Sequence, residues 1–201
     1  MSDVDVTIRA GDVARIIKKL ETLKPAGRNA VLSSAWRRGT LFMENQLKQA
    51  ISGPILKVRT GHLRNSIGSQ ITFETGRIKS VIGSGARTGR RLPYANIHET
   101  GGVIRPKRGK YLAIPIGNMR TAAGVGKMPA RDFFRANKSS AFIVNGIVYN
   151  AVGKTGISPS YVLKRSVTIP ARHYMSLTVQ KFGGNVVKIV EDWVNRAVEA
   201  K

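Results

Sequence analysis

The chain has 201 residues, 42% of them hydrophobic and 22% charged, a composition typical of a folded globular protein and not of a disordered tail or a fibrous repeat. Lys and Arg number 34 against 11 Asp and Glu, a formal net charge of +23, which attracts nucleic acid, anionic lipid or acidic protein surfaces. The absence of cysteine excludes disulfides, thiolate metal sites and a cysteine nucleophile. Without an apolar leader or a long uncharged run, we expect a soluble protein with no membrane partner.

Two short elements are expected in residues 1–27. Apolar side chains alternate with polar ones at the start of the chain, the period of a half-buried strand: Val4, Val6 and Ile8. Asp12 is a suitable N-cap for a short helix that ends before Pro25. We therefore expect a strand and a short helix to precede the main body of the protein.

A long helix is predicted from Arg28 to Ile51. No proline and a single glycine, Gly39, interrupt this stretch, and its apolar residues recur at spacings of three, four and seven. The opposite face is charged, and it is either a solvated face or a surface that lines phosphates. Its residues are Arg28, Arg37, Arg38, Glu44 and Lys48.

Several β-rich runs follow, bounded by turn residues: Ile71–Phe73, Arg77–Ile82, Tyr111–Ile116, Ala141–Val152 and Tyr161–Ile169. The first two form a hairpin around Thr75-Gly76, and Asn145-Gly146 is a favoured type I′ pair for a second hairpin. A final helix follows Pro170 and extends through Ala197. The order predicts an α+β fold in which a long N-terminal helix and a C-terminal helix pack on a mainly antiparallel sheet. We expect a single domain over 28–200.

The stretch Gly85–Lys138 is rich in glycine and strongly basic, with twelve Lys or Arg and two acidic residues. Glycine-rich basic segments bury little apolar surface, so we expect a long basic loop, mobile at about 117–138. The candidate phosphate-facing or partner-facing cations are Arg87, Arg90, Arg91, Arg105, Lys107, Arg108 and Lys110. Few aromatic residues interleave with these cations, so sequence-specific recognition of nucleic-acid bases is not expected. The alternative is a basic surface that is solvated or faces acidic protein subunits.

Catalytic and cofactor motifs are incomplete. Gly153-Lys154-Thr155 resembles the end of a phosphate loop, but Val148 stands where the motif needs glycine. His98-Glu99 would begin a zinc motif only with a histidine at 102, where Gly102 stands. Close carboxylate pairs and a serine elbow are also missing. The sequence predicts no catalytic residue, no metal and no cofactor, and hence not an enzyme.

Four segments in order carry a resemblance: Thr60–Ile67 (TGHLRNSI), Tyr94–Gly102 (YANIHETGG), Tyr111–Pro115 (YLAIP) and Ile169–Met175 (IPARHYM). Together they resemble the virion morphogenesis and tail-completion (neck) proteins of long-tailed bacteriophages, over roughly residues 28 to 200. In the first segment Leu63 and Ile67, four residues apart, are expected to pack on one face of a short helical turn. In the second, Tyr94 and Ile97 are expected to anchor inward.

The last segment supplies the candidate assembly residues. If the chain stays extended after Pro170, Arg172 and Tyr174 lie on one side of it, and the resemblance implies that this edge serves assembly. The alternative is a simple corner between a strand and a helix. The segment from Asn118 to Lys138 is longer than the family core requires.

The resemblance implies a structural connector of the virion neck, assembled in the host cytoplasm. It implies a homo-oligomeric ring, six-fold in preference to twelve-fold, that joins head-connector proteins to tail-terminator or tail-tube proteins and through which double-stranded DNA passes. The alternative function is a free, sequence-independent nucleic-acid-binding protein, which the same charge would serve. A nuclease lacks the paired acids that would hold its metal.

Overall fold

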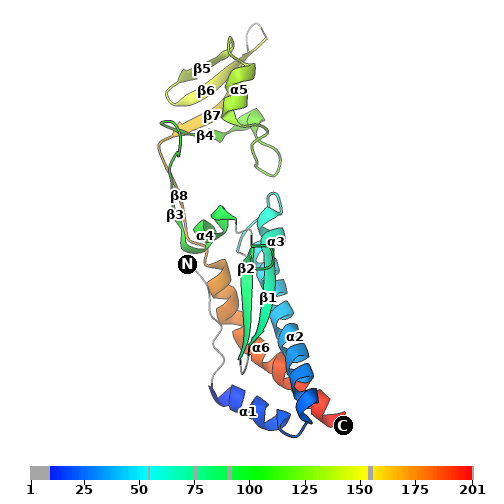
Figure 1. The fold of residues 1–201 in the computed structure, drawn as a ribbon. Coiled ribbons are helices and arrows are strands. Elements are labelled where there is room, and N and C mark those ends of the chain that lie inside the picture. Colours follow the sequence, from blue (N-terminus) through cyan, green and yellow to red (C-terminus); the bar gives the residue numbers. More distant parts are fainter. Residues whose placement is uncertain (1–9, 54, 75–76, 90–91, 154–155, 201) are drawn as a thin grey trace. The chain divides into compact units, whose positions relative to one another are not determined.

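The structure is a computed structural model (Figure 1) and describes residues 10–53, 55–74, 77–89, 92–153 and 156–200. The strand expected at the N-terminus and the Thr75-Gly76 turn lie outside the described residues. The chain forms two compact units: unit 1 contains residues 1–100 and 171–201, and unit 2 contains Gly101–Pro170. This division differs from the single domain expected over 28–200.

Unit 1 consists of helices around one β-hairpin. Its elements are α1 (Ala10–Leu20), α2 (Pro25–Ile51), α3 (His62–Ser66), β1 (Ile67–Glu74), β2 (Arg77–Ser84), α4 (Pro93–Thr100) and α6 (Tyr174–Glu199). The two long helices run side by side in opposite directions, and the β1–β2 hairpin lies against them (Figure 1). The predicted helices and the first hairpin are confirmed. Helix α1 already includes Ala10, so Asp12 lies inside the helix and is not its N-cap.

The core of unit 1 follows the apolar stripe of α2. At one end Ala35 packs with Val190 and Val194 of α6, in a cluster that also takes in α1. At the other end Leu47 and Ile51 pack with Ile67, Tyr174 and Met175. Both long helices therefore pack on the hairpin, as the α+β prediction requires.

Gly39 lies where α2 comes close to α6. A Cβ atom at this position would lie 2.9 Å from Cγ1 of Val186 on α6. The single glycine inside α2 therefore permits close packing of the helix pair, although glycine lowers intrinsic helix propensity.

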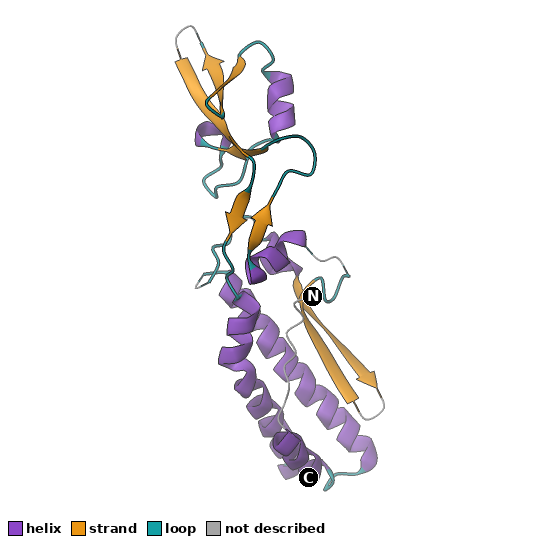
Figure 2. Cartoon of the chain, turned by 90° about the vertical axis from the view of Figure 1, so that its left-hand side faces the viewer, coloured by secondary structure: helices purple, strands orange, loops and turns teal. Residues whose placement is uncertain are grey.

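Unit 2 consists of antiparallel strands and short helices. Its elements are β3 (Gly102–Ile104), β4 (Leu112–Pro115), η1 (Gly117–Met119), α5 (Ala130–Ala136), β5 (Ala141–Val144), β6 (Ile147–Val152), β7 (Gly156–Lys164) and β8 (Val167–Ile169). Strands β3 and β8 pair with each other, and the other four form a sheet in the order β4-β7-β6-β5. Figure 2 draws the strands in orange and the helices in purple. The hairpin at Asn145-Gly146 is confirmed, with φ values of 49° and 75° at these two residues.

The segment 117–138 is more structured than a long loop. It contains η1 and α5, and Phe133 of α5 is 3% exposed, packed against Val148 and Tyr161 of the sheet. The Tyr161 hydroxyl donates to the backbone carbonyl of Met128 at 2.9 Å. Residues 130–136 therefore form a helix where a loop was expected, because Phe133 and Phe134 supply an apolar anchor that the surrounding glycine and basic residues conceal. The mobility of the segment stays a prediction.

Candidate polyanion-binding and assembly surfaces

The connection between the two sheets of unit 2 gathers basic side chains. The β3–β8 ladder ends at the pair Ile104 and Val167, and the β4–β7 ladder begins at the pair Leu112 and Lys164. Two stretches of chain run between these pairs, 105–111 on one side and 165–166 on the other. Because both ends of each stretch are held by paired strands, the two stretches lie next to each other in the fold.

Six exposed cations lie in this place, and we call them the junction cluster: Arg105, Lys107, Arg108, Lys110, Lys164 and Arg165. The first four are candidates from the sequence. Lys164 and Arg165 were missed, because they lie inside the predicted strand run Tyr161–Ile169 and stand far from the basic stretch in the sequence. The signal that could have found them is the antiparallel pairing of β4 with β7, which was not predicted from the sequence.

The electrostatics of unit 2 favour a polyanion at the junction cluster. Unit 2 carries twelve Lys or Arg and one acidic residue, Asp132 of α5. Like charges so close together repel one another, and that repulsion is relieved when a polyanion replaces small counterions. The cluster can therefore bind phosphates or carboxylates through charge alone, without reading bases.

The other candidate cations of the basic stretch belong to unit 1. Arg87 is exposed, and its backbone is held beside Gly68 of β1 by the turn that follows β2. Its positive charge helps to lower the pKa of Glu44. Arg90 and Arg91 lie outside the described residues.

Glu44 is a buried acid on α2, not a member of a solvated face. It is 7% exposed, and its carboxylate accepts hydrogen bonds from Lys48 at 2.5 Å and Ser69 at 2.6 Å. Burial alone would raise the pKa of Glu44, but these two hydrogen bonds and the charge of Lys48 hold it below its ordinary value. The charged face expected on α2 is therefore partly a structural network.

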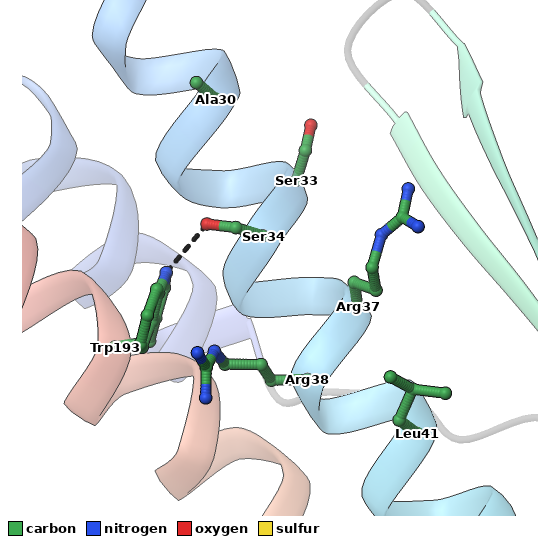
Figure 3. Close-up of a pocket in the computed structure, with 7 residues that line it drawn as sticks. All are labelled: Ala30, Ser33, Ser34, Arg37, Arg38, Leu41 and Trp193. Atoms are coloured by element: carbon green, nitrogen blue, oxygen red, sulfur yellow. Dashed lines mark hydrogen bonds between the residues drawn. The ribbon is translucent and has the colours of Figure 1, made fainter.

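Another part of the α2 face forms an open depression with α6. Figure 3 shows Trp193 of α6 pointing toward Ser34, whose hydroxyl accepts its indole N–H at 2.7 Å. The guanidinium carbon of Arg38 lies 3.6 Å from the centre of the Trp193 ring, a cation–π contact, while Arg37 extends away. The depression holds two cations, and one of them, Arg38, is already engaged with Trp193 in joining the two helices.

The proposed assembly edge at Arg172 and Tyr174 has a different geometry from the expected one. The chain does not stay extended, because His173 adopts φ 49° and α6 begins at the next residue. Tyr174 is fully buried, so its side chain is not available to a partner in this fold. Burial and the nearby Glu99 carboxylate raise the pKa of Tyr174 to about 12. Arg172 remains exposed.

The same corner joins three of the four segments of the resemblance, and we call it the α4–α6 node. The backbone N–H of Arg172 donates to the backbone carbonyl of His98 at 2.8 Å. The backbone N–H of His173 donates to the backbone carbonyl of Glu99 at 3.1 Å. Leu63 and Ile67 pack beneath it with Tyr174, as expected from their spacing. The inward residues of the YANIHETGG segment are Ala95 and Glu99, whereas Tyr94 is 39% exposed, so the expectation that Tyr94 anchors inward was wrong.

Glu99 is the charged centre of the α4–α6 node. Its carboxylate is 2% exposed and accepts the backbone N–H groups of Met175 and Ser176 at 2.8 and 3.0 Å, together with the Ser176 hydroxyl at 2.5 Å. Nearby, Nδ1 of His98 is buried without a hydrogen-bond partner among the described residues. Burial lowers the pKa of His98, and the charges of Arg172 and Arg59 add to the effect.

Metal ligands do not converge in the described ranges, where no group of three or more His, Asp or Glu side chains could hold an ion. Nor does any helix within those ranges have the length and apolar character needed to cross a membrane. Comparisons with family models, with curated proteins and with solved structures found no match for this chain.

Proposed function

We propose that this chain is a structural protein of the bacteriophage neck, which forms a ring that completes the tail and joins it to the DNA-filled head. The observation that carries the proposal is the α4–α6 node. Three of the segments on which the resemblance depends, Thr60–Ile67, Tyr94–Gly102 and Ile169–Met175, meet in this one structural unit. The fourth segment supplies β4 of unit 2.

In this proposal the protein performs no chemistry and needs no cofactor. Several copies form a cyclic ring, six-fold in preference to twelve-fold, that contacts head-connector and tail-terminator or tail-tube proteins. The junction cluster of each copy faces an acidic surface of one of these partners. Passing DNA is the less favourable occupant, because strong phosphate contacts would resist its release.

Imaging of assembled virions tests the ring. We expect several copies in a ring at the head-to-tail junction, whereas one copy per particle, or none, would overturn the proposal. Purified protein examined by mass photometry, alone and with its head or tail partners, shows when the ring assembles.

A second test separates acidic partners from DNA. Arg105, Lys107, Arg108 and Lys110 are replaced together by glutamine, and the control carries the same four-charge change at the exposed residues Lys18, Lys57, Lys79 and Lys188 of unit 1. We expect the first variant to block joining of heads to tails and to leave duplex binding close to that of the control.

The alternative function is a free, sequence-independent nucleic-acid-binding protein, favoured by the net positive charge of unit 2. If it holds, the junction variant weakens duplex binding uniformly across sequences. The slope of log affinity against log salt then falls by up to about 3.6, since each phosphate contact contributes about 0.9.

A further inference from the structure

Among the described strands, none pairs with the outer edge of β5 in the four-stranded sheet. Strand β5 reads Ala-Phe-Ile-Val, without a charge or a proline, and it lies at the end of the strand order. Exposed edges are usually blocked by lysine, proline or a bulge. The opposite edge has such a device, because β4 ends in Pro115 and Gly126 packs against the ring of that proline.

The hydrogen-bond pattern leaves Ile143 at the centre of this edge. The two-residue turn makes Val144 and Ile147 a hydrogen-bonded pair, and Ala151 donates to the carbonyl of Ser140 in the same register. Alternation then directs the N–H and C=O of Ile143 away from β6. The N–H of Ala141 is already used, since it donates to Asn137 at 2.8 Å.

The face of this sheet that points away from α5 is apolar. Residues that pair directly share a face, and one row crosses all four strands: Ile114, Val162, Ile147 and Val144. Beside that row the rings of Phe142 and Tyr149 stack at 5.6 Å. The second face of an antiparallel sheet is ordinarily polar when it meets water. Here Val144 is 48% and Phe142 38% exposed at the β5 end.

We propose that residues 3–8 of one copy add as a fifth strand to the β5 edge of a neighbouring copy. This segment lies outside the described residues, and its sequence alternates Val4, Val6 and Ile8 with polar residues. A strand paired to Ile143 would direct those three side chains onto the outer face and so extend the row that ends at Val144. The inference rests on the proposed ring, because it requires a second copy.

Charge and symmetry both favour this occupant over a second β5 strand. The alternation that places the valines outward turns Asp3 and Asp5 toward the face that carries α5, whose vicinity is basic through the exposed residues Arg131, Arg135 and Lys138. Pairing of two β5 strands would bring two basic units together about a two-fold axis. A segment given by one copy to the next is head-to-tail, the kind of contact that closes a cyclic ring.

Engineered cysteines test the pairing in a chain that has none of its own. Protein carrying Val144→Cys is mixed with protein carrying Val4→Cys, Val6→Cys or Ile8→Cys under mild oxidation. Facing cysteines on paired strands lie within disulfide reach, so we expect one of the three mixtures to give a disulfide-linked heterodimer. Thr7→Cys is the matched control, because its side chain lies on the other face.

A backbone variant provides an independent test. Ile143→Pro removes the outward N–H and leaves the ladder to β6 intact, whereas Ile143→Thr retains the N–H and a β-branched side chain. The probe is a peptide of residues 2–9, added to full-length protein whose own segment is disabled by Val4→Asp and Val6→Asp. We expect Ile143→Pro to weaken peptide binding at least about tenfold relative to Ile143→Thr.

Each outcome has a defined meaning. A disulfide between Val144→Cys chains alone would overturn the inference in favour of β5–β5 pairing. A further protein carries Val144→Cys and one of the N-terminal cysteines in the same chain, and a disulfide formed solely within that chain would overturn the second copy as donor. Rings without any cross-link would refute this inference and leave the proposed function standing. Cross-linked chains that never close into rings would support the inference and refute the proposed function.

Discussion

The Glu99 carboxylate accepts the backbone N–H of Met175 at 2.8 Å, which joins the last turn of α4 to the first turn of α6. Helix α6 receives no side-chain cap from its own N-cap residue, His173. Its first N–H groups are capped instead by an acid 76 positions earlier in the chain. A negative charge at this end also complements the helix dipole.

Replacement of Glu99 by alanine should lower the free energy of unfolding by about 2–4 kcal/mol, because buried hydrogen bonds to a charged group contribute about 1.5–3 kcal/mol each and do not add fully. Urea denaturation measures the change. The control is Glu191→Ala, which removes an ion pair of 3.4 Å to the largely exposed Arg15 and should cost less than about 1 kcal/mol. Equal losses in the two variants would contradict a capping role for Glu99.

Gly39→Ala should destabilise unit 1 although alanine favours helix. The gain in propensity is about 1 kcal/mol, and overpacking against the stiff Val186 side chain costs about 1–3 kcal/mol. The control is Gly184→Ala on α6, where an added Cβ meets nothing within 4 Å and where stability should rise by about 0.5–1 kcal/mol. A stabilised Gly39→Ala variant would show that the helix pair can separate slightly without loss.

Glu44 should make stability depend on acid pH. Its folded pKa is held below the ordinary value of 4.5, so its contribution is fully present above the unfolded pKa and is lost as pH falls through the folded one. We expect Glu44→Gln to show a flatter loss of stability than the unmodified protein between about pH 5 and pH 3. Urea denaturation over this range tests it, and identical slopes would argue against the Lys48 and Ser69 contacts.

Tyr174 should make the free energy of unfolding depend on pH in the alkaline range. Its pKa is raised to about 12 in the folded protein, against about 10 in an unfolded chain. The neutral phenol therefore stabilises the fold fully below the unfolded pKa, and that contribution declines as pH rises from about 10 to 12. Tyr174→Phe should remove this decline, as followed by thermal unfolding at several alkaline pH values. Control measurements use Tyr94→Phe, which alters an exposed ring.

Hydrogen exchange should distinguish two parts of the segment 117–138. We expect slow exchange in the last turn of α5, whose Phe133 is buried in the core of unit 2, and fast exchange at the exposed residues Ala122 and Ala123. Phe133→Ala should bring α5 to the faster rate. Uniform fast exchange over the whole segment of the unmodified protein would restore the single mobile loop expected from composition.

The sequence was sufficient for the elements with strong periodicity. Both long helices, the β1–β2 hairpin and the Asn145-Gly146 turn were predicted, because each depends on local spacing or turn chemistry. Helix α5 was missed, since its few apolar residues stand within basic and glycine-rich sequence. The burial of Glu44, Glu99 and Tyr174 depends on partners far along the chain, which local patterns do not reveal.

Unit 2 is inserted between Thr100 and Ala171, and the strands that lead into and out of it pair at Gly102 and Ile169. An unfolded insertion of this length would oppose contact between its ends, at an entropic cost that grows with the logarithm of its length. Once unit 2 has folded, the two ends are delivered together and the Glu99 cap can close over α6. Pairing of β3 with β8 thus lowers the entropic cost of closing the contacts between α4 and α6.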